Sequence, residues 1–188
     1  MRNLWVLVGI FAALAVASSA GSFDVLLNID TYVDSANANQ SFSQDDILWA
    51  SSVDGTPVKE VYLGFLNNFV RARAKSPENI SSATLKLYAS KVEKPGRIVA
   101  YISEGAALET TTWEYRLTYN SDMAVPFSVA GEGEYIVDAT PLVKNAVEIC
   151  PGECPYSIIL VAEESASVAF ASAEASPEKA PSLKYDAA

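Results

Sequence analysis

The sequence contains no histidine among its 188 residues. This absence excludes Ser-His-Asp and Cys-His catalysis, and also zinc sites that need an imidazole ligand. Basic residues are scarce as well, because 13 lysines and arginines face 23 aspartates and glutamates, for a formal net charge of −10. Nucleic acids need basic surfaces, since their phosphates are negative. We therefore expect a protein that does not bind nucleic acid and has no histidine-dependent chemistry.

Only two cysteines are present, Cys150 and Cys154, in the stretch CPGEC. Two thiolates alone do not complete a tetrahedral metal site. Pro151-Gly152 supplies turn-forming residues between them, and disulfides persist in exported proteins. We predict a disulfide between Cys150 and Cys154 that closes a tight loop.

Long apolar runs are missing except near the start of the chain, in LWVLVGIFAALAV. Arg2 precedes this run and the small residues Ser18 and Ala20 follow it, which is the pattern of a secretory signal peptide. A retained membrane anchor is the alternative, but the run is shorter than the ~20 residues that span a bilayer. We predict a signal peptide at residues 1–20, no membrane span after its cleavage, and a single secreted domain at residues 21–188, extracellular or at the cell surface.

Period-two alternation is clearest in Ile80–Ser90, with the sequence ISSATLKLYAS. Such alternation indicates a half-buried strand with one face on a core and the other towards water. We expect Leu85 and Leu87 on the core side and Lys86 on the solvent side. Pro-Gly turn signals follow the stretch, so it is predicted to be a central strand of an antiparallel sheet.

Other segments are also predicted to be strands from their β-branched, aromatic or alternating composition. They are Phe23–Val33, Ile47–Ser52, Lys59–Leu66, Gly96–Ser103, Thr111–Tyr119, Pro126–Ala130, Glu134–Ala139, Tyr156–Glu163, Val168–Ala173 and Ser182–Asp186. Residues 131–133 (GEG) are typical of a hairpin tip, and Thr140-Pro141 is typical of a helix start, with Thr140 as N-cap of a short helix that ends near Cys150. The predicted fold is all-β, an antiparallel β-sandwich of jelly-roll type with one short helix.

Six local patterns occur in a fixed order: DTYV from Asp30, ISSATLKLY from Ile80, WEYRLTYN from Trp113, VDATPLV from Val137, FASAE from Phe170 and PSL from Pro181. In this order they resemble the motifs of the DNRLRE family, secreted prokaryotic modules related to carbohydrate-binding modules and to disaggregatase-related proteins. The resemblance implies a jelly-roll sandwich that usually serves as an accessory module in large extracellular proteins.

Aromatic side chains are the first candidates for a ligand site, because flat rings cover the apolar faces of sugars. The chosen candidates are Trp49, Tyr62 and Tyr119, and the same argument extends to Tyr88, Tyr101 and Tyr115. A half-buried structural role is the alternative for each tyrosine. Trp113 is expected in the core because of its motif.

Acidic side chains are candidates for Ca²⁺, which takes six to eight oxygen ligands. Asp30, Asp34 and Asp138 are the predicted ligands, and Asp45 and Asp46 are further ones, although EF-hand spacing is absent. Solvated surface charge is the alternative, and no other cofactor is expected. Asn39 and Asn79 begin glycosylation sequons.

Two functions from different classes follow from these observations. The first is a secreted, non-catalytic module that binds polysaccharide at the cell surface or in the matrix and acts in adhesion. The second is a structural subunit that binds copies of itself and assembles into an extracellular filament or surface layer. No catalytic residue is predicted, because the chain offers neither a histidine, nor a convincing nucleophile, nor a cofactor motif.

Overall fold

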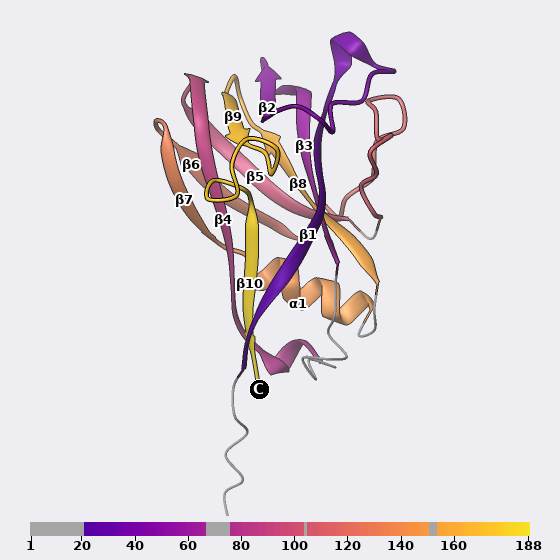
Figure 1. Ribbon diagram of the computed structural model, residues 1–188, viewed down its shortest axis with the longest axis vertical. Helices are drawn as coiled ribbons and strands as arrows, with labels where there is room; N and C mark the ends of the chain where they lie inside the picture. The colour runs from indigo at the N-terminus through magenta and orange to yellow at the C-terminus, as the bar shows by residue number, and fades with distance from the viewer. Residues whose placement is uncertain (1–20, 67–75, 104, 151–153) are drawn as a thin grey trace, which may run out of the picture.

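The computed structural model describes residues 21–66, 76–103, 105–150 and 154–188, and the predicted signal peptide lies outside this part. Within it the chain forms ten strands, one α-helix and two 3-10 helices (Figure 1). They are β1 (Gly21–Asp34), η1 (Ser35–Asn37), β2 (Ile47–Val53), β3 (Thr56–Leu66), η2 (Pro77–Asn79), β4 (Ile80–Lys94), β5 (Gly96–Ser103), β6 (Ala124–Val129), β7 (Gly133–Asp138), α1 (Thr140–Ile149), β8 (Pro155–Ala162), β9 (Ser167–Ala171) and β10 (Ser182–Ala187).

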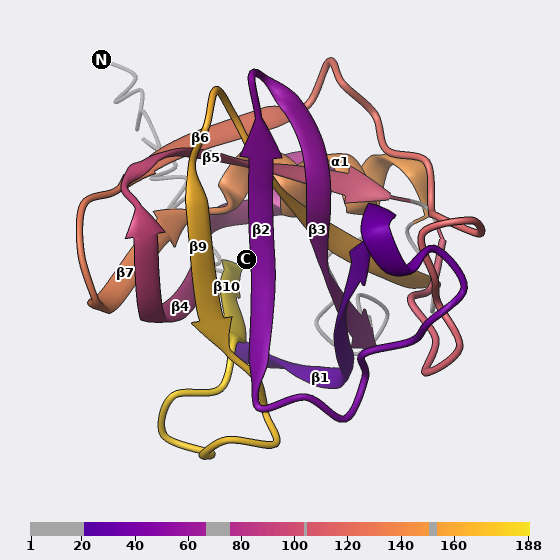
Figure 2. The same cartoon turned by 90° about the horizontal axis from the view of Figure 1, so that it is seen from above.

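All the strand pairs in the described part of the chain are antiparallel, and they build two layers that share strands. One layer contains β6, β5, β8, β3 and the second half of β1, and the other contains β7, β4, β10 and the first half of β1. Strands β2 and β9 pair with each other and join β3 to β4, so that β2 lies between β9 and β3 in the view from above (Figure 2). The predicted all-β antiparallel sandwich with one short helix is confirmed.

Strand β1 passes from one layer to the other. Its residues 21–25 pair with β10 and its residues 26–34 pair with β3, with a register shift between Leu27 and Ile29. Gly64 of β3 lies opposite Ile29, and a Cβ atom there would approach Ile29 Cγ2 to 2.5 Å. The two strands can come this close because Gly64 has no side chain.

The main core fills the space between the layers. Leu85 and Leu87 of β4 are fully buried in it, as the alternation predicted, whereas Lys86 is half-buried on the opposite face. Leu142 and Val143 of α1 pack against the same core. The strand is longer than expected because it continues to pair with β9 beyond Ala89.

A second, smaller cluster lies on the outer face of β3 and β8. It contains Val33, Tyr62, Ala107, Ile159 and Val161, and the half-buried Ile29, Tyr101, Trp113, Leu117 and Tyr119 pack against it. We call it the outer cluster. Residues 105–123 cover the outer cluster. The prediction of a strand at Thr111–Tyr119 is wrong, because the aromatic side chains of this irregular segment pack down onto the sheet.

Two local predictions about turns and caps are also wrong. Strands β6 and β7 do not form a hairpin, because β6 pairs with β5 in one layer and β7 with β4 in the other. The helix N-cap is Ala139 instead of Thr140, whose Oγ1 accepts a hydrogen bond from Ala83 N at 2.8 Å. The turn at Asp54-Gly55 has positive φ angles of 50° and 79°, which suit a two-residue hairpin loop.

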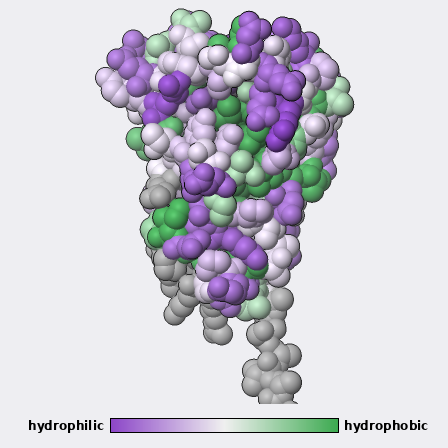
Figure 3. Space-filling view, turned by 180° about the vertical axis from the view of Figure 1, so that it is seen from behind, coloured by the Kyte–Doolittle hydropathy of each residue, from purple (hydrophilic) through white to green (hydrophobic). Residues whose placement is uncertain are grey.

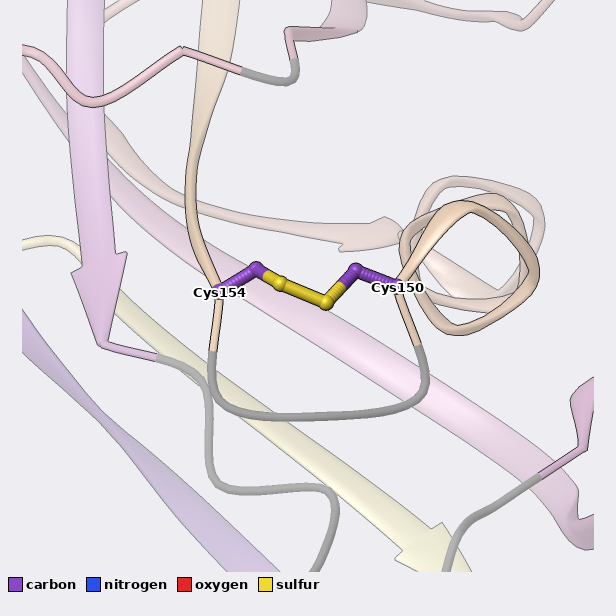
Figure 4. Close-up of a disulfide and its surroundings, with 2 residues drawn as sticks. All are labelled: Cys150 and Cys154. Atoms are coloured by element: carbon purple, nitrogen blue, oxygen red, sulfur yellow. A yellow bond between two sulfur atoms is a disulfide. The ribbon is translucent and has the colours of Figure 1, made fainter.

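The predicted disulfide is present. Cys150 at the end of α1 is bonded to Cys154 just before β8, with their Cα atoms 6.2 Å apart (Figure 4). The bond fixes the helix end to the start of a buried strand.

Burial predicts different costs for two neighbouring substitutions in β4. Leu87→Ala should lower the free energy of unfolding by roughly 2–5 kcal/mol, because it removes a fully buried side chain. Lys86→Ala should change it by about 0.5 kcal/mol or less. Urea denaturation of both variants tests this, and equal losses would contradict the strand register.

Candidate functional site

Trp49 of β2 is half-buried, and two ammonium groups lie near its ring. Lys59 Nζ is 5.5 Å and Lys91 Nζ is 5.1 Å from the centre of its ring. We call Trp49, Lys59 and Lys91 the Trp49 surface. Such distances are typical of cation–π contacts.

Strand pairing explains how this surface forms. Trp49 is directly opposite Ala169 of β9, and Ala169 is directly opposite Lys91 of β4, so the three side chains share one face. The small Ala169 lets the lysine chain reach the indole. Lys59 comes from β3, where its Nζ is 3.5 Å from Asp34 Oδ2 and 5.7 Å from the centre of the Tyr32 ring.

Polar groups continue the Trp49 surface. Lys91 Nζ donates to Glu93 Oε1 at 2.7 Å, and Ser167 Oγ donates to Glu93 Oε2 at 3.2 Å. The hydrogen bond from Lys91 holds the pKa of Glu93 below its usual range. Ser51 Oγ lies 2.9 Å from Ser167 Oγ. A flat apolar ring therefore stands beside donors and acceptors that can reach the hydroxyl groups of a ligand.

The other two predicted aromatic residues belong to the outer cluster. Tyr62 has no exposed surface, and its hydroxyl donates to Glu60 Oε2 at 2.7 Å. Burial, reinforced by the charge of Glu60, raises the pKa of Tyr62. Its ring is thus enclosed in the protein. Sequence reasoning missed Glu60, although its position two residues before Tyr62 on a strand puts both side chains on one face.

Tyr119 is half-buried and more accessible. Its ring stacks on Tyr101, with centroids 4.4 Å apart. Burial, followed by the charge of Glu60, raises the pKa of Tyr119. The neighbouring Trp113 packs against the outer cluster. The guanidinium carbon of Arg116 lies 3.9 Å from the centre of the Trp113 ring.

The structure does not gather the three predicted calcium ligands. Asp30 Oδ2 accepts from Ala173 N at 2.8 Å, Asp34 Oδ1 accepts from Ala36 N at 2.9 Å, and Asp138 Oδ1 accepts from Thr140 N at 3.0 Å. Each carboxylate thus accepts a hydrogen bond from the backbone of a different segment. Among the described residues, no three His, Cys, Asp or Glu side chains are grouped to hold a metal ion.

The two sequons differ in their surroundings. Asn39 is exposed in the turn after η1. Asn79 Nδ2, the atom that a glycan would modify, donates to Ala188 O at 3.1 Å.

The model of carbohydrate-binding module family 96 matches residues 22–185, and the chain belongs to that family. A comparison with curated proteins finds no match. The expected relation to carbohydrate-binding modules is confirmed, whereas the DNRLRE name stays a prediction. In the described part of the chain, no helix has the length and hydrophobicity needed to cross a membrane.

Asp30 predicts a pH dependence of stability. Burial raises the pKa of this carboxyl above its ordinary value of 3.8, and the Ala173 N–H only partly opposes the shift. A carboxyl whose pKa is higher in the folded state than in the unfolded state adds to the free energy of unfolding. This stabilisation is complete below the unfolded-state pKa and is lost as pH rises through the folded-state pKa. The unfolding free energy of the wild type minus that of Asp30→Asn should therefore fall as pH rises from about 3 to about 6.

Chemical denaturation at a series of pH values measures this difference. Asp24→Asn, which removes an exposed carboxylate from the same strand, controls for the loss of one negative charge. A difference that is constant or rises with pH would contradict the role assigned to burial of Asp30.

Proposed function

We propose that this protein is a secreted, non-catalytic module that binds polysaccharide through the Trp49 surface, at the cell surface or in the matrix, and so acts in adhesion. The observation that carries the proposal is the half-buried indole of Trp49 with Lys59 and Lys91 within 5.5 Å of its ring centre. Membership of a carbohydrate-binding family supports it.

The Trp49 surface has the chemistry that a sugar ring requires. One face of the indole can cover the C–H groups of a pyranose, and the surrounding polar groups can bond to its hydroxyls. Lys59 is already oriented by Asp34 and by two aromatic rings, so less side-chain entropy is lost when a ligand binds. Both ammonium groups can also pair with carboxylates of acidic sugars.

Two acidic residues, Asp45 and Glu163, have structural partners. Tyr32 Oη donates to Asp45 Oδ2 at 3.2 Å, and Arg97 Nε lies 3.0 Å from Glu163 Oε2. These contacts support a binding role for the module without a catalytic carboxylate pair.

Self-assembly is the alternative function, and the strand edges support it less. Edge strand β6 contains Pro126, which has no N–H to donate to a neighbouring strand. Edge strand β7 has exposed Glu134 and Asp138. On the face shown in Figure 3, hydrophobic residues lie among hydrophilic ones.

Loss of the indole should weaken polysaccharide binding. Trp49→Ala should reduce affinity at least tenfold, or about 1.4 kcal/mol, because the apolar contact with the sugar ring is lost. Native gels that contain hydroxyethyl cellulose or hyaluronan measure this as reduced retardation. Tyr115→Ala is the matched control, because Tyr115 is 75% exposed and lies outside the Trp49 surface. Equal retardation of wild type and Trp49→Ala would contradict the proposal.

Lys91 should distinguish acidic from neutral polymers. Lys91→Met keeps a long apolar side chain on the indole but removes the ammonium group. Retardation by hyaluronan should fall and should depend less on salt, whereas retardation by hydroxyethyl cellulose should change little. The same gels run at low and high ionic strength test this. Identical behaviour of wild type and variant with hyaluronan would show that Lys91 does not contact the polymer.

A further inference from the structure

A hollow of about 420 Å³ lies beside Tyr119, between the irregular segment and the end of α1. We call it the Tyr119 hollow. Its walls include Ser103, Leu117, Thr118, Tyr119, Asn120 and Ile149. The volume falls within the range of about 300–1,000 Å³ that is usual for small-molecule sites.

The walls of the hollow are held in place before any ligand binds. Ser157 Oγ of β8 donates to Gly105 O at 2.9 Å and accepts from Ala107 N at 2.8 Å. At the other end of the segment, Asn120 N donates to Ile102 O at 3.1 Å. Tyr119 is further supported by its stacked partner Tyr101. A preformed site loses little conformational entropy on binding.

The lining selects a class of ligand. Leu117, Ile149 and the Tyr119 ring present apolar surface, while Ser103, Thr118 and Asn120 add hydrogen-bonding groups. Among the residues that the structure describes, no lysine, arginine, aspartate or glutamate lines the hollow. An uncharged ring with both C–H faces and hydroxyl groups matches such walls, which is the chemistry of a neutral sugar unit. This differs from the Trp49 surface and its two ammonium groups.

The two sites lie on separate parts of the molecule. Trp49 packs against the main core, to which Val61 and Leu63 of β3 belong. Tyr119 packs against the outer cluster, to which Tyr62 belongs. Because successive residues of a strand point to opposite faces, the two clusters lie on opposite sides of β3. A ligand in the hollow therefore leaves the Trp49 surface free.

We propose that the Tyr119 hollow is a second binding site, for a neutral sugar unit, and that one module thereby bridges two segments of polysaccharide. The proposal rests on the proposed function insofar as the Trp49 surface provides the other site. It accounts for adhesion without requiring copies of the chain to bind each other.

Calorimetric titration tests the second site independently of the first. The probes are cellotetraose, mannotetraose and chitotetraose, and the starting protein is Trp49→Ala, in which the Tyr119 hollow is intact. We expect this variant to bind one equivalent of at least one probe. Adding Tyr119→Ala should weaken that binding at least tenfold. Failure of Trp49→Ala to bind any of the three probes would overturn the inference.

Tyr119→Ala also removes a ring from the outer cluster, so it could weaken binding by disturbing the fold. A second variant therefore blocks the hollow and keeps that ring. Ile149→Trp adds bulk to the wall of the hollow while Tyr119 stays in place, and it should weaken binding to Trp49→Ala at least tenfold. Leu26→Trp, at a 65% exposed position of β1, is the matched control and should bind like its parent. Unchanged binding in both the Tyr119→Ala and Ile149→Trp variants would also overturn the inference.

The two proposals fail in different ways. If Trp49→Ala is retarded by hyaluronan, the acidic polymer, as strongly as wild type, the proposed role of the Trp49 surface is wrong. If retardation depends on Trp49 but the hollow variants bind tetrasaccharide normally, only the second site is wrong.

Discussion

The exchange of partners by β1 is the constraint on which the rest of the structure depends. The strand leaves β10 and joins β3 at the register shift beside Ile29, where Gly64 allows close approach. Its second half then contributes side chains to both clusters: Tyr32 reaches the main core and Val33 the outer cluster. The same half ends at Asp34, which orients Lys59. Both candidate sites therefore depend on this crossing.

Strands whose signal is local could be predicted from the sequence. In β4 the alternation around Leu85 and Leu87 records one buried face, and no distant partner is needed to recognise it. The segment Thr111–Tyr119 has equally strand-like composition, yet its aromatic rings cover a sheet face instead of entering a sheet. Residues 131–133 have the composition of a hairpin tip, but local turn chemistry does not reveal that β6 and β7 join different layers.

The candidate sites were predictable only in part, for the same reason. Trp49 and Tyr119 follow from side-chain chemistry alone. The lysines beside Trp49 do not, because their positions result from pairing between strands that are distant in sequence. The sequence pattern did not indicate that Tyr62 is buried. Burial decides whether a ring is enclosed by the protein or can be reached by a ligand. The three aspartates had suitable oxygens, but each carboxylate bonds to a different backbone segment.

The pairing of Gly21 with Ala187 places the beginning of β1 beside the end of β10, whereas β2, which carries Trp49, lies towards the other end of the long axis (Figure 1). Antiparallel hydrogen bonds run perpendicular to their strands. A force that pulls Gly21 and Ala187 apart therefore loads the β1–β10 bonds one after another, and the pair unzips easily. A force applied along the long axis, between Gly21 and β2, runs along β1 and loads its bonds together.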